Sequence, residues 1–186
     1  MIGRLPTSIK IGGKNFKIRS DYRDCLTIIS AFQDPDLSLE EQFQVLLEIM
    51  YPQHEEISRD DVKEALEKGV SFLNCDKKEE SRKIEKPVYD WEQDEQIIFS
   101  AINKVAQKEV RAVEYMHWWT FLGYFNEIGQ GTFSTIVSIR DKLNRGKKLD
   151  DWEKDFLKDN KSLVELKKRR SKQEQELIDK LNAMYS

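Results

Sequence analysis

The sequence predicts a mainly α-helical protein with about seven or eight helices, preceded by an N-terminal β-hairpin and ending in a long charged C-terminal helix. Apolar residues recur at spacings of three and four through most of the 186 residues, as on one face of a helix. Only eight Gly and four Pro are present, which is too few for a turn-rich β protein. Charged residues make up 35% of the chain, so long helix faces should lie in solvent.

Residues 1–19 are predicted to form the hairpin. Apolar and basic residues alternate on either side of Gly12 and Gly13. Because glycine accepts a positive φ without a Cβ penalty, this pair predicts a two-residue turn. A phosphate-binding loop is rejected, because Asn15 stands after Lys14 where that motif requires Ser or Thr.

Residues 20–73 are predicted to form a first helical half of three helices. The first helix should begin at Ser20-Asp21 and end before Pro35, which cannot continue a helix. Ser38 and Glu41 have the spacing of a capping box, which predicts the start of the second helix. Ser58 is predicted to cap the third.

Residues 74–88 are almost wholly charged and are predicted to be a mobile linker. Residues 89–160 should form a second helical half, whose first helix begins near Asp90. The stretch from Ala112 to Ile128 is apolar nearly all round a helix, which predicts a buried aromatic helix. Further helices are expected after Thr132 and Asp150.

Residues 161–186 are predicted to form a C-terminal helical arm. A polar run interrupts its apolar pattern, so no core can pack against that part of the arm. We therefore expect the arm to face cargo or a neighbouring subunit; the alternative is a terminal helix that folds back on its own domain or is disordered. The predicted partner-binding residues are Lys167, Lys168, Arg169, Arg170, Leu177, Ile178 and Leu181.

The sequence contains no recognisable catalytic constellation. His54 and His117 are the only histidines, and Cys25 and Cys75 lie fifty positions apart, so none of these residues has the spacing of metal ligands. We predict free thiols, a packed His117 satisfied by one hydrogen bond, no catalytic residue, no metal and no cofactor. The protein is accordingly predicted not to be an enzyme.

The charge balance of the chain indicates which classes of partner the protein binds. The net charge of −3 predicts binding neither to nucleic acid nor to a membrane, and no apolar stretch is long enough to span a bilayer. Residues 34–68 carry a net charge of −8 and residues 139–172 a net charge of +6. This asymmetry predicts head-to-tail association into a homo-oligomer, with ordinary solvated helix faces as the alternative.

Arg140 falls on the apolar side of its predicted helix, between Ile136 and Leu143. A buried guanidinium requires a partner of opposite charge. We predict that Arg140 pairs with Asp94 or Glu95 in a structural rather than a catalytic contact.

Several segments occur in an order that resembles a known family. They are Leu5-Pro6-Thr7, Asp21 to Asp24, Tyr89 to Asp94, Met116 to Phe121, and Ile139-Arg140 before Trp152-Glu153. Over nearly its whole length the chain resembles the bacteriophage gene-product-fifteen family, found in tailed phages and prophages of Gram-positive bacteria. The residues that carry the resemblance as a structural motif are Asp94, His117, Trp118, Trp119 and Arg140.

The resemblance implies a non-catalytic tail assembly chaperone. Such a protein would bind the phage tape-measure protein, with the tail-tube protein as a second candidate partner. It would act in the cytoplasm of the bacterial host and be absent from the mature virion. The alternatives are a structural tail component kept in the virion, or a phage-encoded regulatory protein or enzyme with no recognisable motif.

Overall fold

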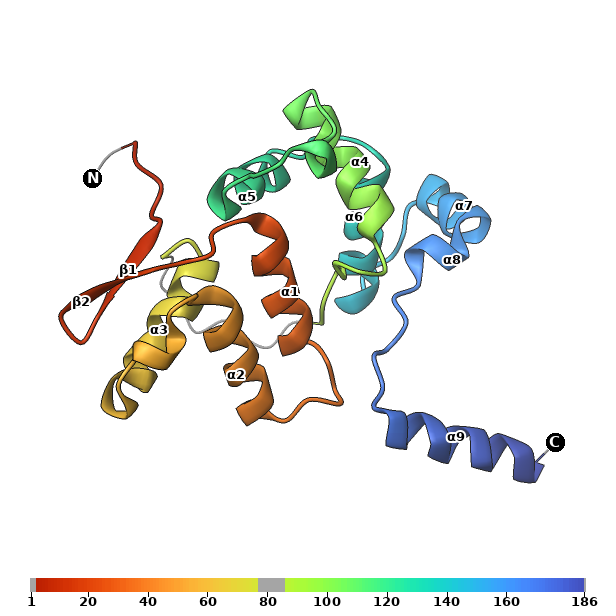
Figure 1. Cartoon of the computed structure of the whole chain (residues 1–186). Helices are drawn as coiled ribbons and strands as arrows, with labels where there is room; N and C mark the ends of the chain where they lie inside the picture. The colour runs from red at the N-terminus through yellow and green to blue at the C-terminus, as the bar shows by residue number, and fades with distance from the viewer. Residues whose placement is uncertain (1–2, 77–85, 186) are drawn as a thin grey trace. The chain divides into compact units, whose positions relative to one another are not determined.

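The computed structural model describes residues 3–76 and 86–185; the side chains at 181 and 183–185 lie outside this description. The protein is mainly helical with an N-terminal hairpin, which confirms the predicted fold class (Figure 1). The chain divides into two compact units. Unit 1 comprises residues 1–78 and 168–186, and unit 2 comprises residues 79–167.

The predicted hairpin is present in unit 1. Strand β1 (Ser8–Ile11) pairs antiparallel with β2 (Lys14–Lys17). Gly12 and Gly13 form the turn with φ of 53° and 83°, conformations that favour glycine. The Gly12 N–H donates to Glu64 Oε2 at 2.9 Å, and a Cβ at Gly12 would lie 2.3 Å from Asp61 Oδ2. The tip of the hairpin therefore lies directly against the start of the third helix.

Three helices complete the main part of unit 1: α1 (Tyr22–Phe32), α2 (Leu39–Met50) and α3 (Val62–Leu73). Asp21 caps α1, and the predicted capping box of Ser38 and Glu41 opens α2. Between α2 and α3 lie the 3₁₀ turns η1 (His54–Glu56) and η2 (Arg59–Asp61). The third helix was expected to follow Ser58 directly; η2 intervenes, with Ser58 Oγ donating to Asp61 Oδ2 at 3.0 Å.

The core of unit 1 depends on a close approach of α2 and α3. A Cβ at Gly69 would lie 2.8 Å from Leu46 Cδ2, so a larger residue at this position would force the Leu46 side chain to shift. The buried Tyr51 hydroxyl donates to the Ala65 carbonyl at 2.7 Å, which satisfies the polar end of a core side chain. The large side chains that α1, α2 and the hairpin bury include Ile11, Phe16, Tyr22, Ile28, Leu46 and Met50.

Unit 2 contains α4 (Glu95–Ala106), η3 (Val110–Ala112), α5 (Trp118–Asn126), α6 (Thr132–Asn144), α7 (Asp151–Asp159) and α8 (Lys161–Val164). An aromatic cluster with ring centroids 4.7–6.4 Å apart links α4 and α5 to the segment before α4 and to the start of α6. Ile136, Ile139 and Val164 form the centre of a second apolar cluster. Of the predicted linker 74–88, residues 77–85 lie outside the described part of the chain.

The helix expected to start near Asp90 begins later. Asp90 Oδ1 accepts from the N–H groups of Glu92 and Gln93 at 3.0 and 2.9 Å, and this local turn precedes α4. An aspartate that bonds nearby backbone N–H groups competes with helix formation, which explains the delay. Helix α4 therefore begins at Glu95, with Asp94 at its N-cap position.

The aromatic helix is shorter and less buried than predicted. The segment from 112 to 128 is α-helical only in α5, and within α5 only Trp118 and Phe121 are buried. His117 is not within the helix but at its N-cap, where Nδ1 accepts from the Trp119 N–H at 3.1 Å. His117 is buried, as predicted, and this cap bond is one of its contacts.

The C-terminal helical pattern is broken. The predicted C-terminal helical arm of residues 161–186 is not one continuous helix, because α8 ends at Val164 and α9 (Lys172–Tyr185) follows only after a non-helical stretch. Helix α9 starts with its own capping box, since the Glu174 N–H donates to Ser171 Oγ at 3.1 Å and the Ser171 N–H to Glu174 Oε2 at 3.3 Å.

Candidate functional site

The best-defined polar cluster in unit 2 is built around Arg140 of α6. Its side chain is 5% exposed and that of Asp94 is 4% exposed. Nη1 of Arg140 lies 2.6 Å from Asp94 Oδ2, and Nη2 lies 3.0 Å from Asp94 Oδ1. The predicted pairing of Arg140 with Asp94 is confirmed, and it has the two-point geometry that guanidinium and carboxylate groups favour.

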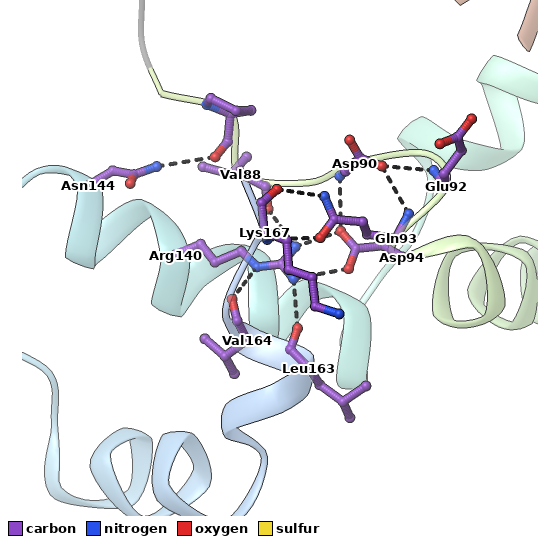
Figure 2. Close-up of polar contacts among 11 residues, drawn as sticks. Val88, Asp90, Glu92, Gln93, Asp94, Arg140, Asn144, Leu163, Val164 and Lys167 are labelled. Carbon is purple, nitrogen blue, oxygen red and sulfur yellow. Dashed lines mark hydrogen bonds and ion pairs between the residues drawn. The ribbon is translucent and has the colours of Figure 1, made fainter. Parts of the chain in front are cut away.

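The remaining donors of Arg140 bind backbone carbonyls from two other segments. Nε donates to Val164 O at 2.7 Å and Nη2 to Leu163 O at 2.6 Å, so Arg140 satisfies carbonyls at the end of α8. Nη1 also donates to Val88 O at 3.1 Å. All five N–H groups of the guanidinium are thereby used, and Figure 2 shows them converging on Asp94, Leu163 and Val164.

A second set of hydrogen bonds extends this cluster toward Lys167. Gln93 Nε2 donates to Lys167 O at 2.9 Å, and the Lys167 N–H donates back to Gln93 Oε1 at 2.8 Å (Figure 2). Asp94 Oδ2 also accepts from the Asp90 N–H at 3.0 Å. The end of unit 2 at Lys167 is therefore fixed by backbone contacts, while its exposed side chain remains in solvent.

The Arg140 cluster is structural. A guanidinium whose five donors are all bound has none left for a ligand, and the Asp94 carboxylate is occupied on both oxygens. Among the described residues, no buried side-chain nitrogen or oxygen lacks a hydrogen-bond partner. What the cluster does is hold three segments of unit 2 together.

The other motif residues lie in the aromatic part of unit 2. Trp118 is buried and stacks on Phe121 at a centroid distance of 5.9 Å, whereas Trp119 is half-buried. His117 and Trp119 form an edge contact at 6.0 Å. The sequence motif thus falls into a helix cap with its packed aromatic neighbours and the separate Arg140–Asp94 pair.

The predicted partner-binding residues lie in the C-terminal segment. Lys168 and Arg170 are exposed, Arg169 is half-buried, and on α9 Leu177 is exposed and Ile178 half-buried. The side chain of Leu181 lies outside the described part of the structure. The Lys172 N–H donates to Asp36 Oδ1 at 2.8 Å, which ties the start of α9 to the loop before α2.

Unit 2 also has two apolar hollows that sequence reasoning missed. One, of about 520 Å³, is lined by α4, the loop 128–131 and the start of α6. The other, of about 490 Å³, lies between the segment before α4, the end of α5 and α6. Ile128 and Phe133 line both hollows, so the two lie next to each other. Their apolar lining is formed mainly by Ile97, Ala101, Val105, Ile128, Phe133, Tyr89, Phe125 and Val137.

Among the described residues, the other side chains that could act as nucleophiles or metal ligands are dispersed. Cys25 and Cys75 are free thiols, as predicted, and burial raises the pKa of the Cys25 thiol, which makes it a poor nucleophile. Within residues 3–76 and 86–185, no three His, Cys, Asp or Glu side chains are grouped to hold a metal ion. None of the helices described is long and apolar enough to cross a membrane.

These features define a mainly α-helical protein whose buried Arg140–Asp94 cluster is structural and whose second unit carries two apolar hollows. The chain belongs to the bacteriophage Gp15 protein family, whose model matches residues 1–166. This confirms the resemblance carried by the motif residues. Comparisons with curated proteins and with solved structures gave no match. The family match ends just before the basic residues that precede α9.

Proposed function

We propose that this phage protein is a non-catalytic tail assembly chaperone that binds the tape-measure protein before the tail tube forms around it. Membership of the bacteriophage Gp15 protein family supports this proposal, because the resemblance to that family implies a tail assembly chaperone. The chaperone would work in the host cytoplasm and leave before the virion is complete. The tail-tube protein is a second candidate partner.

The observation that carries the proposal is the pair of neighbouring apolar hollows in unit 2. Hollows of about 520 and 490 Å³ that share Ile128 and Phe133 offer apolar surface on neighbouring parts of unit 2. An amphipathic or apolar helix binds such a surface by placing side chains from successive turns into it. A long helical cargo would present segments of this kind, and covering them would keep the cargo soluble.

The polar rim of the larger hollow adds a means of orientation. Lys104, Gln130 and Thr132 line it beside the apolar residues. Few polar groups around an apolar surface are typical of sites that fix the direction of a bound segment. The expected ligand is therefore a helix with an apolar stripe and a polar or acidic flank near Lys104.

The test is co-purification of the full chain with the tape-measure protein of the same phage. Val105→Glu and Ile128→Glu place a charge in the hollows and should reduce the amount captured at least about tenfold. Leu143→Glu is the matched control, because Leu143 is exposed on α6 and does not line either hollow. Equal capture by all three variants would refute the hollows as the binding surface.

Mass spectrometry of purified virions separates this proposal from its main alternative. A chaperone should be absent from mature particles, whereas a structural tail component should be present in a fixed ratio to the tube protein. A stoichiometric amount in the virion would overturn the chaperone proposal. Failure of the tape-measure protein to co-purify with the full chain would favour a regulatory or enzymatic role.

A further inference from the structure

Unit 1 exposes an apolar strip on α2. Leu39 is 70% exposed, and Phe43, one turn further along the same face, is also exposed. The Phe43 ring meets the half-buried Phe32 ring edge-on at a centroid distance of 6.3 Å. Large apolar side chains gathered on one exposed face are typical of a contact surface rather than of solvated residues scattered singly.

This strip lies within the most acidic part of the chain. Residues 34–58 contain seven Asp or Glu and no Lys or Arg. Asp34 and Asp36 precede the strip, and Glu40 and Glu48 lie on α2 with it. An occupant of this surface should therefore be an apolar segment accompanied by positive charge.

The C-terminal segment of the same chain has that chemistry. Lys168, Arg169 and Arg170 precede α9, and Lys172 is its first residue. On this helix Leu177 is 59% exposed. Cations near a helix N-terminus are disfavoured by the helix dipole, so this basic run does not stabilise α9. Acidic residues outside the helix would compensate for the unfavourable position of these basic residues at the N-terminus of α9.

One contact in the structure already joins these two regions. The Lys172 N–H donates to Asp36 Oδ1 at 2.8 Å, so the acidic loop before α2 accepts the start of the basic segment. This contact within one chain nevertheless leaves both Leu39 and Leu177 exposed. Within the single chain, therefore, neither of these apolar surfaces covers the other.

We propose that the occupant is a second copy of this chain. The Leu177 side of α9 from one copy packs on the Leu39–Phe43 strip of α2 in the other, with the basic run beside the acidic residues. Each copy carries both surfaces, so two copies exchange α9 in a closed dimer or successive copies continue as an open array. This inference does not depend on the proposed function, because the hollows of unit 2 are a different surface.

The first test is analytical ultracentrifugation of the full chain at micromolar concentration in 50 and 500 mM salt. We expect dimers or larger species whose dissociation constant rises at least about tenfold at the higher salt, because screening weakens the charge complementarity. A monomer at every concentration in both buffers would overturn the proposal. So would an assembly that persists unchanged when residues 171–186 are removed.

Point variants then locate the contact. Leu39→Glu and Leu177→Glu should each raise the dissociation constant at least about tenfold, because each puts a charge into an apolar interface. Both positions are mostly exposed in the single chain, so far-ultraviolet circular dichroism should show unchanged helix content. Leu143→Glu, at another exposed leucine, should leave association as it is.

Mixing the two variants provides the decisive measurement. Leu177→Glu keeps an intact α2 strip and Leu39→Glu keeps an intact α9, so one correct pairing remains between them. The mixture should form a 1:1 complex that is stronger than either variant forms with itself. No complex on mixing would refute this pairing of surfaces, even if the wild-type chain associates.

Capture of the tape-measure protein by the full chain is measured as a separate result, so that the two proposals can fail independently. A chain that stays monomeric but captures the tape-measure protein refutes the self-association alone. A chain that associates through Leu39 and Leu177 but captures nothing refutes the proposed function alone.

Discussion

Substitution of Arg140 is the most direct test of how unit 2 is held together. Arg140→Ala removes five hydrogen bonds at once and leaves the 4% exposed Asp94 carboxylate without its counter-ion. The carbonyls of Val88, Leu163 and Val164 also lose a donor. The effect should therefore exceed that of an ordinary surface ion pair.

The expected magnitude follows from this burial. Removing one partner of a buried, hydrogen-bonded pair costs about 3–5 kcal/mol, because the other charge is left uncompensated. Arg140→Lys keeps the charge but supplies three donors in place of five, so we expect a loss of about 2–4 kcal/mol. Replacing both partners, as Arg140→Met with Asp94→Leu, should restore part of the loss.

Tryptophan fluorescence measures this effect in unit 2 alone. All four tryptophans, at 91, 118, 119 and 152, lie within residues 79–167. Urea unfolding followed by this signal gives the free energy of unfolding of unit 2. Arg145→Ala is the control, because the Arg145–Asp141 pair on α6 is half exposed and should contribute under about 1 kcal/mol.

A loss below about 1 kcal/mol for Arg140→Ala would refute the reasoning, since that is the range of exposed pairs. A loss equal to that of Arg145→Ala would have the same meaning. Either result would place the Arg140 side chain in solvent and remove the basis for calling the cluster structural.

Three further predictions concern other parts of the chain. In the same fluorescence assay, truncation after Arg170 should leave the unfolding midpoint of unit 2 unchanged. Truncation after Ser162 should lower that midpoint sharply, because it removes the Leu163 and Val164 carbonyls that accept from Arg140. Gly12→Ala should destabilise the protein by more than Gly13→Ala, as measured by urea unfolding followed by circular dichroism. Both glycines have positive φ, so each substitution should lower the free energy of unfolding by about 1–2 kcal/mol. Only at Gly12 would the new Cβ also lie 2.3 Å from an oxygen of Asp61. Hydrogen bonds from Arg111 lower the pKa of Glu109 from its ordinary value near 4.5 to about 2. The stabilising contribution of this carboxylate is therefore present above pH 4.5 and is lost as the pH falls toward 2. An NMR titration of the Glu109 carboxyl with a midpoint near 4.5 would contradict this prediction.

Sequence patterns predicted the elements whose signals are local. Gly12 and Gly13 specify the hairpin turn, and the Ser38–Glu41 spacing specifies the start of α2, because each depends on residues within one turn of the chain. The same rule was available at Ser171 and Glu174 and predicts the start of α9. Their position inside a highly charged run concealed this signal.

Features that depend on distant residues were only partly predictable. The apolar position of Arg140 indicated that it needs a partner, but nothing local indicates that the carbonyls of Leu163 and Val164 complete its hydrogen bonds. The aromatic composition of 112–128 predicted a longer, more buried helix than α5. Composition does not reveal that His117 caps the helix and so sets its first residue. The hollows at Ile128 and Phe133 arise from packing, which spacing does not record.

The placement of Arg140 also has a consequence for chain connectivity. Unit 2 is inserted between two parts of unit 1, and its ends near Val88 and Val164 bind the same guanidinium. The insertion therefore behaves as a closed loop whose two ends are pinned at one point. An insertion whose ends are held together adds little loop-closure entropy to the folding of the unit that contains it. Changes in the length or sequence of the insertion should therefore have little effect on the stability of unit 1. During synthesis this closure must wait for residues 163–164, so unit 2 cannot reach its final stability until nearly nine-tenths of the chain has been made.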